Sequence, residues 1–221
     1  MQALLGAVND ATAMVFLTTP DNPSGFAPLV EEVLDLHRHL PDDCLLVVDE
    51  AYMDFAVPQE RYSIISLAGR APNLVVLRTF SKLYGLAGLR LGYGVMPERL
   101  ADCLLRVKLP FSVNVLAEAA GIVALDDVVF RSETIRTVVQ GREMLTRVLG
   151  EMGFLVYPSQ ANFILVKPPM AASELFEKLL RRGIIIRPLS SYGLTDHLRI
   201  TIGNAEENQA LLKAIQEILT P

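Results

Sequence analysis

The first half of the chain alternates between short apolar runs and helical periodicity. Met14–Leu17 and Cys44–Val48 are continuous apolar runs, and leucine and valine recur at helical spacing over residues 29–40 between them. A continuous apolar run, unlike an alternating one, is typical of a strand that is covered on both faces. A strand, a helix and a strand in this order predict a βαβ unit with parallel pairing and a right-handed crossover.

Two further apolar runs extend this predicted sheet, and a change of pattern follows them. Asn73–Leu77 and Leu91–Val95 are expected as strands, and helices are expected over Arg99–Val107, Val115–Leu125 and Phe130–Met152. The remaining pattern predicts the order β-β-α-β-β-α over Phe154–Tyr157, Asn162–Val166, Ala172–Arg181, Ile184–Arg187, His197–Ile202 and Glu206–Leu219. We therefore expect an α/β protein with a mostly parallel sheet in residues 1–128 and a small α+β domain in residues 129–221.

Composition excludes several classes of protein. The chain has 221 residues, 51% hydrophobic and 20% charged, and its formal net charge of −5 comes with no basic tract, which argues against nucleic acid as the main partner. No apolar run approaches the ~18 residues that a membrane span needs. Cys44 and Cys103 are too few for a disulfide framework or a four-thiolate zinc site, and no metal site is expected. The N-terminus lacks a secretory pattern, so the cytoplasm is the expected compartment.

A first candidate for chemistry stands at the end of a predicted strand. Asp49 ends the run that begins at Cys44, and Tyr52 lies in the loop that follows. Ligands of open α/β sheets bind at this edge, although an aspartate there can also simply cap a turn. A Walker-B magnesium site at Asp49-Glu50 is a further interpretation. It requires a G-x-x-x-x-G-K-[ST] phosphate loop, which the sequence lacks.

A second polar group follows the predicted strand Asn73–Leu77. It contains Thr79, Ser81 and Lys82, and Arg90 comes eight residues after the lysine. Hydroxyls beside a lysine suit an anion site, an unprotonated lysine amine is a nucleophile, and an arginine can bind phosphate through two hydrogen bonds. A single lysine is most often a solvated surface charge, so the combination carries the prediction.

These groups occur in the order and spacing of a known family. The chain resembles the fold-type I, pyridoxal phosphate-dependent aminotransferases at Asn22–Gly25, Asp49–Tyr52, Ser81–Lys82 and Gly88–Arg90. It is most similar to the histidinol-phosphate aminotransferases, whose later signatures are matched by Phe111–Asn114, Ala161–Leu165, Gly183–Arg187 and Leu198–Gly203. The resemblance covers essentially the whole chain and implies the fold-type I large domain, a small C-terminal domain and a pyridoxal 5'-phosphate cofactor.

The resemblance implies catalytic roles for residues of the first half. Lys82 would bind the cofactor aldehyde covalently and later move a proton between substrate and cofactor. Asp49 would pair with the pyridinium nitrogen, and Asn22 and Tyr52 would hydrogen-bond the 3-oxygen of the ring. The cofactor phosphate would be held by Thr79, Ser81 and Arg90.

The substrate side is implied by arginines of the second half. Arg199 resembles the family arginine that binds the anionic end of the substrate, Arg187 is expected as a second, and Asn22 is expected close to the substrate. Asn114 and Asn162 also match family motifs, but either could be a buried amide that satisfies the backbone.

The parent reaction implied by the resemblance transfers an amino group between glutamate and imidazole acetol phosphate in histidine biosynthesis. Its substrates would be histidinol phosphate, glutamate and 2-oxoglutarate, and the intact enzyme would be a homodimer. Alternatives are an aromatic-amino-acid transaminase, a threonine-phosphate decarboxylase relative or a non-catalytic remnant of the fold. The family has an N-terminal segment for which Met1–Ala11 offers no counterpart. We therefore expect a fragment that folds but binds pyridoxal phosphate poorly and does not turn over substrate.

Overall fold

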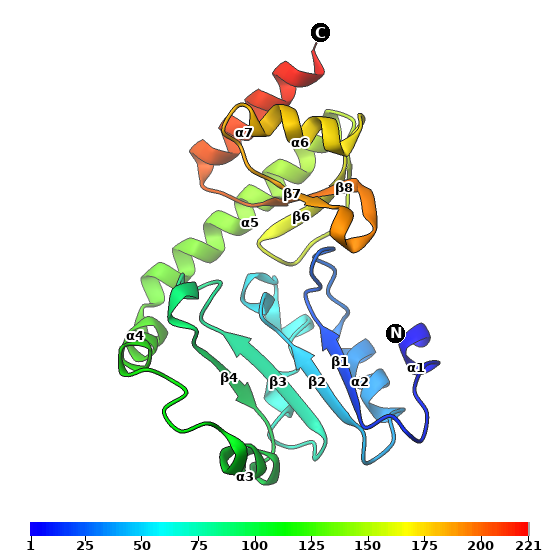
Figure 1. Cartoon of the computed structure of the whole chain (residues 1–221), viewed down its shortest axis with the longest axis vertical. Coiled ribbons are helices and arrows are strands. Elements are labelled where there is room, and N and C mark those ends of the chain that lie inside the picture. The colour runs from blue at the N-terminus through cyan, green and yellow to red at the C-terminus, as the bar shows by residue number, and fades with distance from the viewer. Residues whose placement is uncertain (221) are drawn as a thin grey trace. The chain divides into compact units, whose positions relative to one another are not determined.

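The protein is described by a computed structural model that covers residues 1–220 and divides into two compact units (Figure 1). The first unit consists of Met1–Pro20 and Ala27–Arg131. The second joins Asp21–Phe26 to the residues from Ser132 onward. The division follows Arg131 and places the Asn22 motif in the second unit. The domain boundary after residue 128 stays a prediction.

The first unit contains a four-stranded sheet in the order β1-β2-β3-β4 (Figure 1). Its strands are β1 (Met14–Thr18), β2 (Leu45–Asp49), β3 (Leu74–Thr79) and β4 (Gly92–Val95). The pairings of β1 with β2 and of β2 with β3 are parallel, which confirms the mostly parallel sheet, and β4 is antiparallel to β3. The sequence pattern located β4 but did not indicate its direction.

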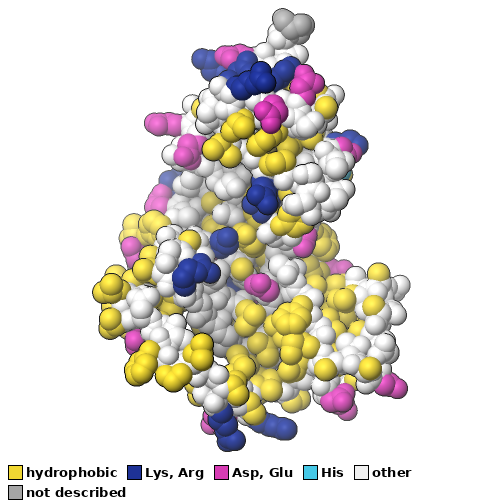
Figure 2. Space-filling model, viewed as in Figure 1, with side chains coloured by type: hydrophobic (Ala, Val, Ile, Leu, Met, Phe, Trp, Pro, Cys, Tyr) yellow, Lys and Arg dark blue, Asp and Glu magenta, His cyan; other side chains and the backbone are white. Residues whose placement is uncertain are grey.

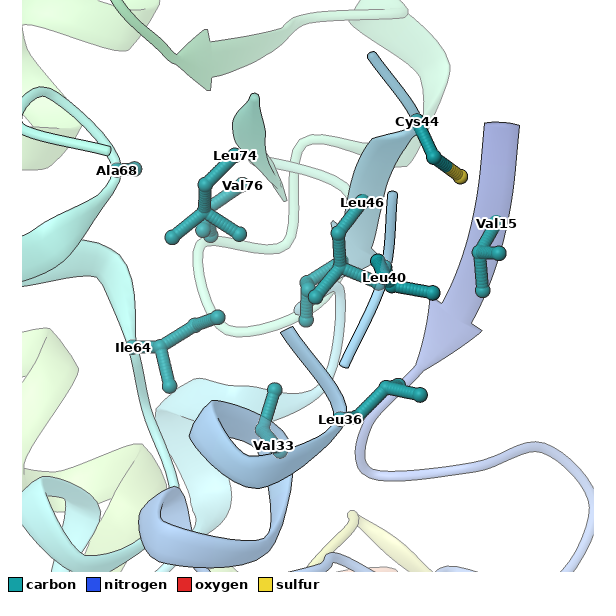
Figure 3. Close-up of a cluster of buried hydrophobic side chains, with 11 residues drawn as sticks. Val15, Val33, Leu36, Leu40, Cys44, Leu46, Ile64, Ala68, Leu74 and Val76 are labelled. Carbon is teal, nitrogen blue, oxygen red and sulfur yellow. The ribbon is translucent and has the colours of Figure 1, made fainter. Parts of the chain in front are cut away.

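Helix α2 (Val30–Arg38) connects β1 to β2 and supplies the first core of the unit. Its first turn is stabilised because the Leu29 amide donates to Oε2 of Glu32 over 2.8 Å. Val33 and Leu36 are fully buried, as the helical spacing predicts, and Figure 3 shows them in one cluster with Leu46 of β2 and other strand residues. Burial of such side chains contributes about 1.5–3 kcal/mol each.

The rest of the first unit is formed by short helices and turns. These are α1 (Gln2–Leu5), the 3-10 turns η1 (Met53–Phe55), η2 (Gln59–Arg61), η3 (Ile65–Leu67) and η4 (Ala87–Leu89), and the helices α3 (Glu98–Val107) and α4 (Val115–Asp126). Oδ1 of Asn114 accepts from the Ala117 amide over 2.9 Å. The motif residue Asn114 is therefore the N-cap of α4.

Helix α5 (Val128–Glu151) begins in the first unit and continues into the second. Within residues 1–220, no helix has the length and apolar character that crossing a membrane requires.

The second unit contains an antiparallel sheet in the order β5-β6-β8-β7. Its elements are β5 (Leu155–Val156), β6 (Phe163–Lys167), α6 (Ala172–Leu180), β7 (Arg187–Leu189), η5 (Ser190–Tyr192), β8 (Leu194–Thr201) and α7 (Ala205–Leu219). The predicted β-β-α-β-β-α order is confirmed. Buried Ile164, Leu198 and Ile200 cover one side of the sheet together with Leu175 and Leu179 of α6.

One predicted strand of this unit is wrong in position. The sequence pattern predicts a strand over Ile184–Arg187, but β7 begins only at Arg187. The Ile184 amide donates to the carbonyl of Leu179 over 3.0 Å, so this apolar segment closes the turn after α6 instead of joining the sheet. Pro188 then lies on β7, an edge strand of the sheet. A proline has no N–H to donate, and on an edge strand this does not interrupt the hydrogen bonds of a central strand.

Candidate active site

The strand register of the first unit brings most of the predicted site residues to one edge of the sheet. Thr18 pairs with Asp49 and Asp49 pairs with Leu77, so the carboxyl ends of β1, β2 and β3 lie together. Thr79 pairs with Gly92, which is the first residue of β4. The loop after β2, the loop after β3 and the segment before β4 therefore all meet at this edge, as expected for a ligand site of an α/β sheet.

Asp49 and Tyr52 lie in the first of these loops. Oδ1 of Asp49 accepts from the Ala51 amide over 3.0 Å, which orients the half-buried carboxylate at the strand end. Oδ2 of Asp49 makes no hydrogen bond within residues 1–220, so the carboxylate keeps acceptor capacity for a ligand.

Lys82 is exposed and lies over the ring of Tyr52. Its Nζ is 4.9 Å from the ring centroid, a cation–π distance, and it forms no ion pair with the part of the chain that the structure describes. Lys82 and Tyr52 are thus in contact, although they come from different strand ends. Lys82 is therefore accessible to a ligand at this edge and would react as a nucleophile only after losing its proton.

Hydroxyls and a guanidinium complete the edge. The Ser81 amide donates to Oγ1 of Thr79 over 3.1 Å, and the Thr79 hydroxyl donates to the carbonyl of Leu91 over 3.5 Å. Arg90 is exposed, and its Nη1 donates to the carbonyl of Ala87 over 2.7 Å. The backbone of Arg90 has φ 54°, a left-handed conformation that costs a non-glycine residue about 1–3 kcal/mol and is concentrated at functional sites.

A buried charged cluster next to this edge was missed by the sequence reasoning. We call Glu50, Asp54, Ser63 and Arg78 the Arg78 cluster. Nε and Nη2 of Arg78 lie 2.9 and 2.7 Å from Oε2 of Glu50, and Nη1 donates to Oδ1 of Asp54 over 2.7 Å. The signal was present as a lone arginine directly after the apolar residues of β3, since such a charge must be paired when it is buried.

The electrostatics of this cluster follow from its burial. Glu50 is 0% exposed, and desolvation raises its pKa, while the neighbouring Arg78 acts in the opposite direction. Desolvation also raises the pKa of Asp54, again opposed by Arg78. Ser63 donates to Oε2 of Glu50 over 2.7 Å, and the Ile64 amide donates to Oε1 over 2.9 Å. Every carboxylate oxygen of Glu50 is therefore satisfied.

The second unit places Arg199 beside Asn22. Nη1 of Arg199 donates to Oδ1 of Asn22 over 2.6 Å, and its Cζ lies 4.9 Å from the ring centroid of Phe163. Nε of Arg199 is buried, and no residue within 1–220 hydrogen-bonds to it. A buried donor without an acceptor is costly, so a ligand acceptor would relieve it.

Arg187 lies directly opposite Arg199 in the ladder between β7 and β8. Directly opposed residues of an antiparallel pair point to the same face, and like charges in such positions repel. Two arginines on one face, one of them with an unsatisfied donor, form a site suited to an anion. The substrate-side roles that the resemblance implies for both residues stay predictions.

The Asn22 loop is held within the second unit by its own hydrogen bonds. The Gln160 amide donates to the carbonyl of Gly25 over 2.8 Å, and the hydroxyl of Ser24 donates to Oδ2 of Asp21. Asn22 therefore contacts Arg199 in this structure, and its contact with the cofactor ring stays a prediction. Asn162 accepts from the Ile202 amide through its backbone carbonyl.

A comparison with known protein families identifies the family of this chain. A model described as aminotransferase class I and II matches residues 1–215. The chain belongs to the aminotransferase class I and II family. This membership confirms the fold class that the motifs indicated.

Individual relatives of this aminotransferase chain narrow the comparison. A histidinol-phosphate aminotransferase from Nitratidesulfovibrio vulgaris (strain Hildenborough) is 58% identical over 217 residues, which are 98% of this chain and 58% of the relative. The crystal structure of histidinol-phosphate aminotransferase from Sinorhizobium meliloti in complex with pyridoxal-5'-phosphate has a TM-score of 0.85 and 32% identity, over 94% of this chain and 57% of that one. L-threonine-O-3-phosphate decarboxylase from Porphyromonas gingivalis has a TM-score of 0.79 and 28% identity, over 99% and 68% of the two chains. The chain thus spans less than two thirds of the length of the curated relative.

The residues at the edge of the first unit fit pyridoxal phosphate by their chemistry. An aldehyde needs an unpaired amine, a pyridine nitrogen needs a carboxylate, and a phosphate needs hydroxyl and guanidinium donors. Lys82, Asp49, Ser81, Thr79 and Arg90 supply these groups from neighbouring strand ends. The described residues contain no group of three or more His, Cys, Asp or Glu that could hold a metal ion.

Proposed function

We propose that this chain serves an aminotransferase that exchanges an amino group between glutamate and imidazole acetol phosphate, with histidinol phosphate and 2-oxoglutarate as the other pair. The observation that carries the proposal is the unpaired Lys82 amine beside Tyr52, at the sheet edge that also bears Asp49. The 58% identity to a histidinol-phosphate aminotransferase supports this substrate class. The cytoplasmic location stays a prediction of the sequence.

The cofactor side of the mechanism is assigned to residues of the first unit. When bound, pyridoxal phosphate supplies an electron-withdrawing ring that stabilises negative charge at the substrate carbon. The Asp49 carboxylate would hold a proton at the ring nitrogen, and the Tyr52 hydroxyl would hydrogen-bond the 3-oxygen. Ser81, Thr79 and Arg90 hold the phosphate. The amine of Lys82 would hold the cofactor at its aldehyde carbon, with loss of water, and as a free amine it would move a proton between the substrate carbon and the cofactor carbon.

The substrate side is assigned to residues of the second unit. Arg199 binds the anionic group of each substrate in turn, because one buried, unsatisfied Nε and the adjacent Nη groups offer charge-assisted hydrogen bonds. Arg187 adds a second positive charge from the neighbouring strand. Asn22 orients the Arg199 guanidinium through the 2.6 Å hydrogen bond.

Two variants, each with one lysine replaced, test the proposal in the full-length protein that carries this sequence. Lys82→Ala is expected to abolish borohydride-trapped pyridoxal phosphate at this position and to abolish glutamate formation from histidinol phosphate and 2-oxoglutarate. Lys178→Ala is the control, since Lys178 is also partly exposed but is paired with Glu174 over 2.8 Å. Trapped cofactor that persists in Lys82→Ala would contradict the assignment.

Two further activity measurements separate the alternative reactions. Carbon dioxide released from threonine phosphate, without glutamate formation, would favour the decarboxylase that some structural relatives represent. Transfer to aromatic oxo acids at a rate equal to that of imidazole acetol phosphate would favour an aromatic-amino-acid transaminase.

The predicted homodimer is supported by exposed apolar side chains in the first unit. Figure 2 shows hydrophobic side chains gathered on the visible surface of the molecule. Val107 and Leu109 are each 76% exposed, Leu116 is 72% exposed and Phe111 is fully exposed. Such a patch on α3, α4 and their connection favours contact with another protein surface. Sedimentation of the full-length protein, compared with a Leu116→Glu variant, tests this association.

A further inference from the structure

The Arg78 cluster lies one or two residues away from three of the proposed cofactor residues. Glu50 follows Asp49, Asp54 comes two residues after Tyr52, and Arg78 precedes Thr79. The three charged side chains thus originate from the loop after β2, from the turn η1 and from the end of β3. One guanidinium connects all three segments.

The geometry of the strands separates the cluster from the ligand side. Successive residues of a strand point to opposite faces, so an Arg78 side chain turned into the cluster directs Thr79 the other way. Glu50, the residue after β2, is fully buried, whereas Asp49 is half-buried. The Arg78 side chain is therefore turned away from that of Thr79, and the polar groups of the cluster are occupied by one another.

Stability alone is a weak explanation for this arrangement. Replacing a buried ion pair by apolar residues of similar volume is often neutral or stabilising, because desolvation offsets the Coulomb attraction. Arg78 is only 8% exposed and still makes hydrogen bonds to Glu50, Asp54 and Ser63 through Nε and both Nη groups. The directional hydrogen bonds of the guanidinium fix distances between segments, which apolar contacts do not do.

Building on the proposed function, we infer that Arg78 is a positioning residue for the cofactor site. Through Glu50 and Asp54 it holds the loop of Asp49 and Tyr52 in a fixed position relative to the loop of Thr79, Ser81 and Lys82. The Lys82–Tyr52 contact joins these same two loops. Loss of the cluster separates the amine, carboxylate and hydroxyls while each loop remains attached to its own strand.

The test uses Asp54→Asn, because this change removes one carboxylate and leaves the Glu50–Arg78 pair in place, so the variant is expected to fold. Its matched control is Val33→Ala, which removes volume from the core on α2, at a residue that is 0% exposed and outside the cluster. Each variant is measured at the same number of degrees below its own unfolding midpoint. Differences in overall stability then do not affect the comparison.

Two readouts distinguish positioning from general destabilisation. The Ala51 and Ser81 amides, which donate within the two loops, are expected to exchange hydrogen about tenfold faster in Asp54→Asn than in Val33→Ala. The affinity of the full-length protein for pyridoxal phosphate is expected to fall about tenfold in Asp54→Asn and to change less than about twofold in Val33→Ala. Equal exchange rates and equal affinities in the two variants would overturn the inference.

The hydrogen-exchange experiment tests the positioning role of Arg78 even if the protein binds no cofactor. If the wild-type protein binds no pyridoxal phosphate, the proposed function fails. The amide exchange rates then decide the positioning role by themselves: faster exchange in Asp54→Asn supports it, and exchange equal to that of Val33→Ala overturns it. Arg78→Lys adds a second point, since it keeps the charge without the fork, and exchange as slow as in wild type would count against the inference.

Discussion

Two arginines of this molecule, Arg78 in the first unit and Arg199 in the second, stand in opposite chemical situations. Arg78 is surrounded by two carboxylates and a hydroxyl, and its guanidinium is paired on all three nitrogens. Within residues 1–220, the amide oxygen of Asn22 is the only side-chain acceptor of Arg199, an aromatic ring lies 4.9 Å from its guanidinium carbon, and its buried Nε has no partner. Both are strand residues that follow a leucine, so the hydrophobic pattern does not distinguish them, although the family motif singles out only Arg199.

The difference shows which arginine is structural and which is open to a ligand. A saturated guanidinium has no donor left for an incoming anion, whereas an unsatisfied one gains a full charge-assisted hydrogen bond when an anion binds. The opposed Arg187 strengthens this conclusion, since its charge also awaits a counter-ion. The hydrogen bonds of the structure therefore distinguish an arginine whose donors are all used within the protein from an arginine that has a donor left for a ligand.

Removal of the saturated arginine gives the largest expected effect. Arg78→Met leaves Glu50 and Asp54 buried without a cation, and the free energy of unfolding is expected to fall by about 3–5 kcal/mol. Urea unfolding measures this loss.

The pH dependence of the same variant sharpens the comparison. Burial already raises the pKa of Glu50, and removal of Arg78 takes away the main opposing interaction. The folded state then binds protons more tightly than the unfolded chain, so the variant gains stability relative to wild type as the pH falls toward the ordinary carboxyl pKa. A loss below about 1 kcal/mol that does not depend on pH would remove the contrast with Arg199.

Removal of the unsaturated arginine is expected to act on binding and hardly on folding. In Arg199→Ala, the affinity of the full-length protein for 2-oxoglutarate and for histidinol phosphate should fall about 10- to 100-fold together, which corresponds to about 1.5–3 kcal/mol. Arg181→Ala, a change of an exposed arginine at the end of α6, is the control. Steady-state and inhibition measurements check both. Weakening for one substrate alone would show that two different groups recognise the anions.

A smaller effect on stability is expected for a glycine substitution in the loop of Asn22, the residue that accepts a hydrogen bond from Arg199. Gly25 has φ +76°, and a Cβ there would lie 2.1 Å from Oγ of Ser159, while Gly193 has φ +75° with no heavy atom within 4 Å of the same position. Gly193→Ala therefore measures backbone strain alone, about 1–2 kcal/mol. Gly25→Ala should cost at least about 1 kcal/mol more because of the overlap. Thermal unfolding compares the two, and equal losses would mean that Ser159 moves without cost.

The smallest effect is expected at an exposed ion pair of the second unit. Nζ of Lys167 lies 2.6 Å from Oδ2 of Asp196, and this hydrogen bond lowers the pKa of Asp196. A carboxyl with a lowered pKa contributes stability above its ordinary pKa, and this contribution is lost as the pH falls through the lowered value. Both side chains are about half exposed, so solvent screens the pair. Asp196→Asn should leave the unfolding midpoint nearly unchanged at pH 7, and a large drop would show that this pair resembles the Arg78 cluster.

Much of the fold and of the candidate site follows from the sequence, because both depend on local patterns. Apolar runs mark β1, β2 and β3 to within about two residues, since a strand covered on both faces must be apolar throughout. The polar residues directly after these runs, Asp49 and Thr79 among them, are placed at one edge by parallel pairing alone. The motifs around Lys82 then indicate the chemistry.

Only the tertiary structure decided how the charged residues are divided between the interior and the ligand side. The direction of β4, the closing role of Ile184 and the saturation of Arg78 depend on partners that are distant along the chain. The grouping of Asn22 with Arg199, 177 positions away, has the same origin. A side chain's hydrogen-bond capacity is fixed by its type, but whether that capacity is spent inside the protein or left for a ligand depends on which groups the folded chain brings within about 3 Å of it.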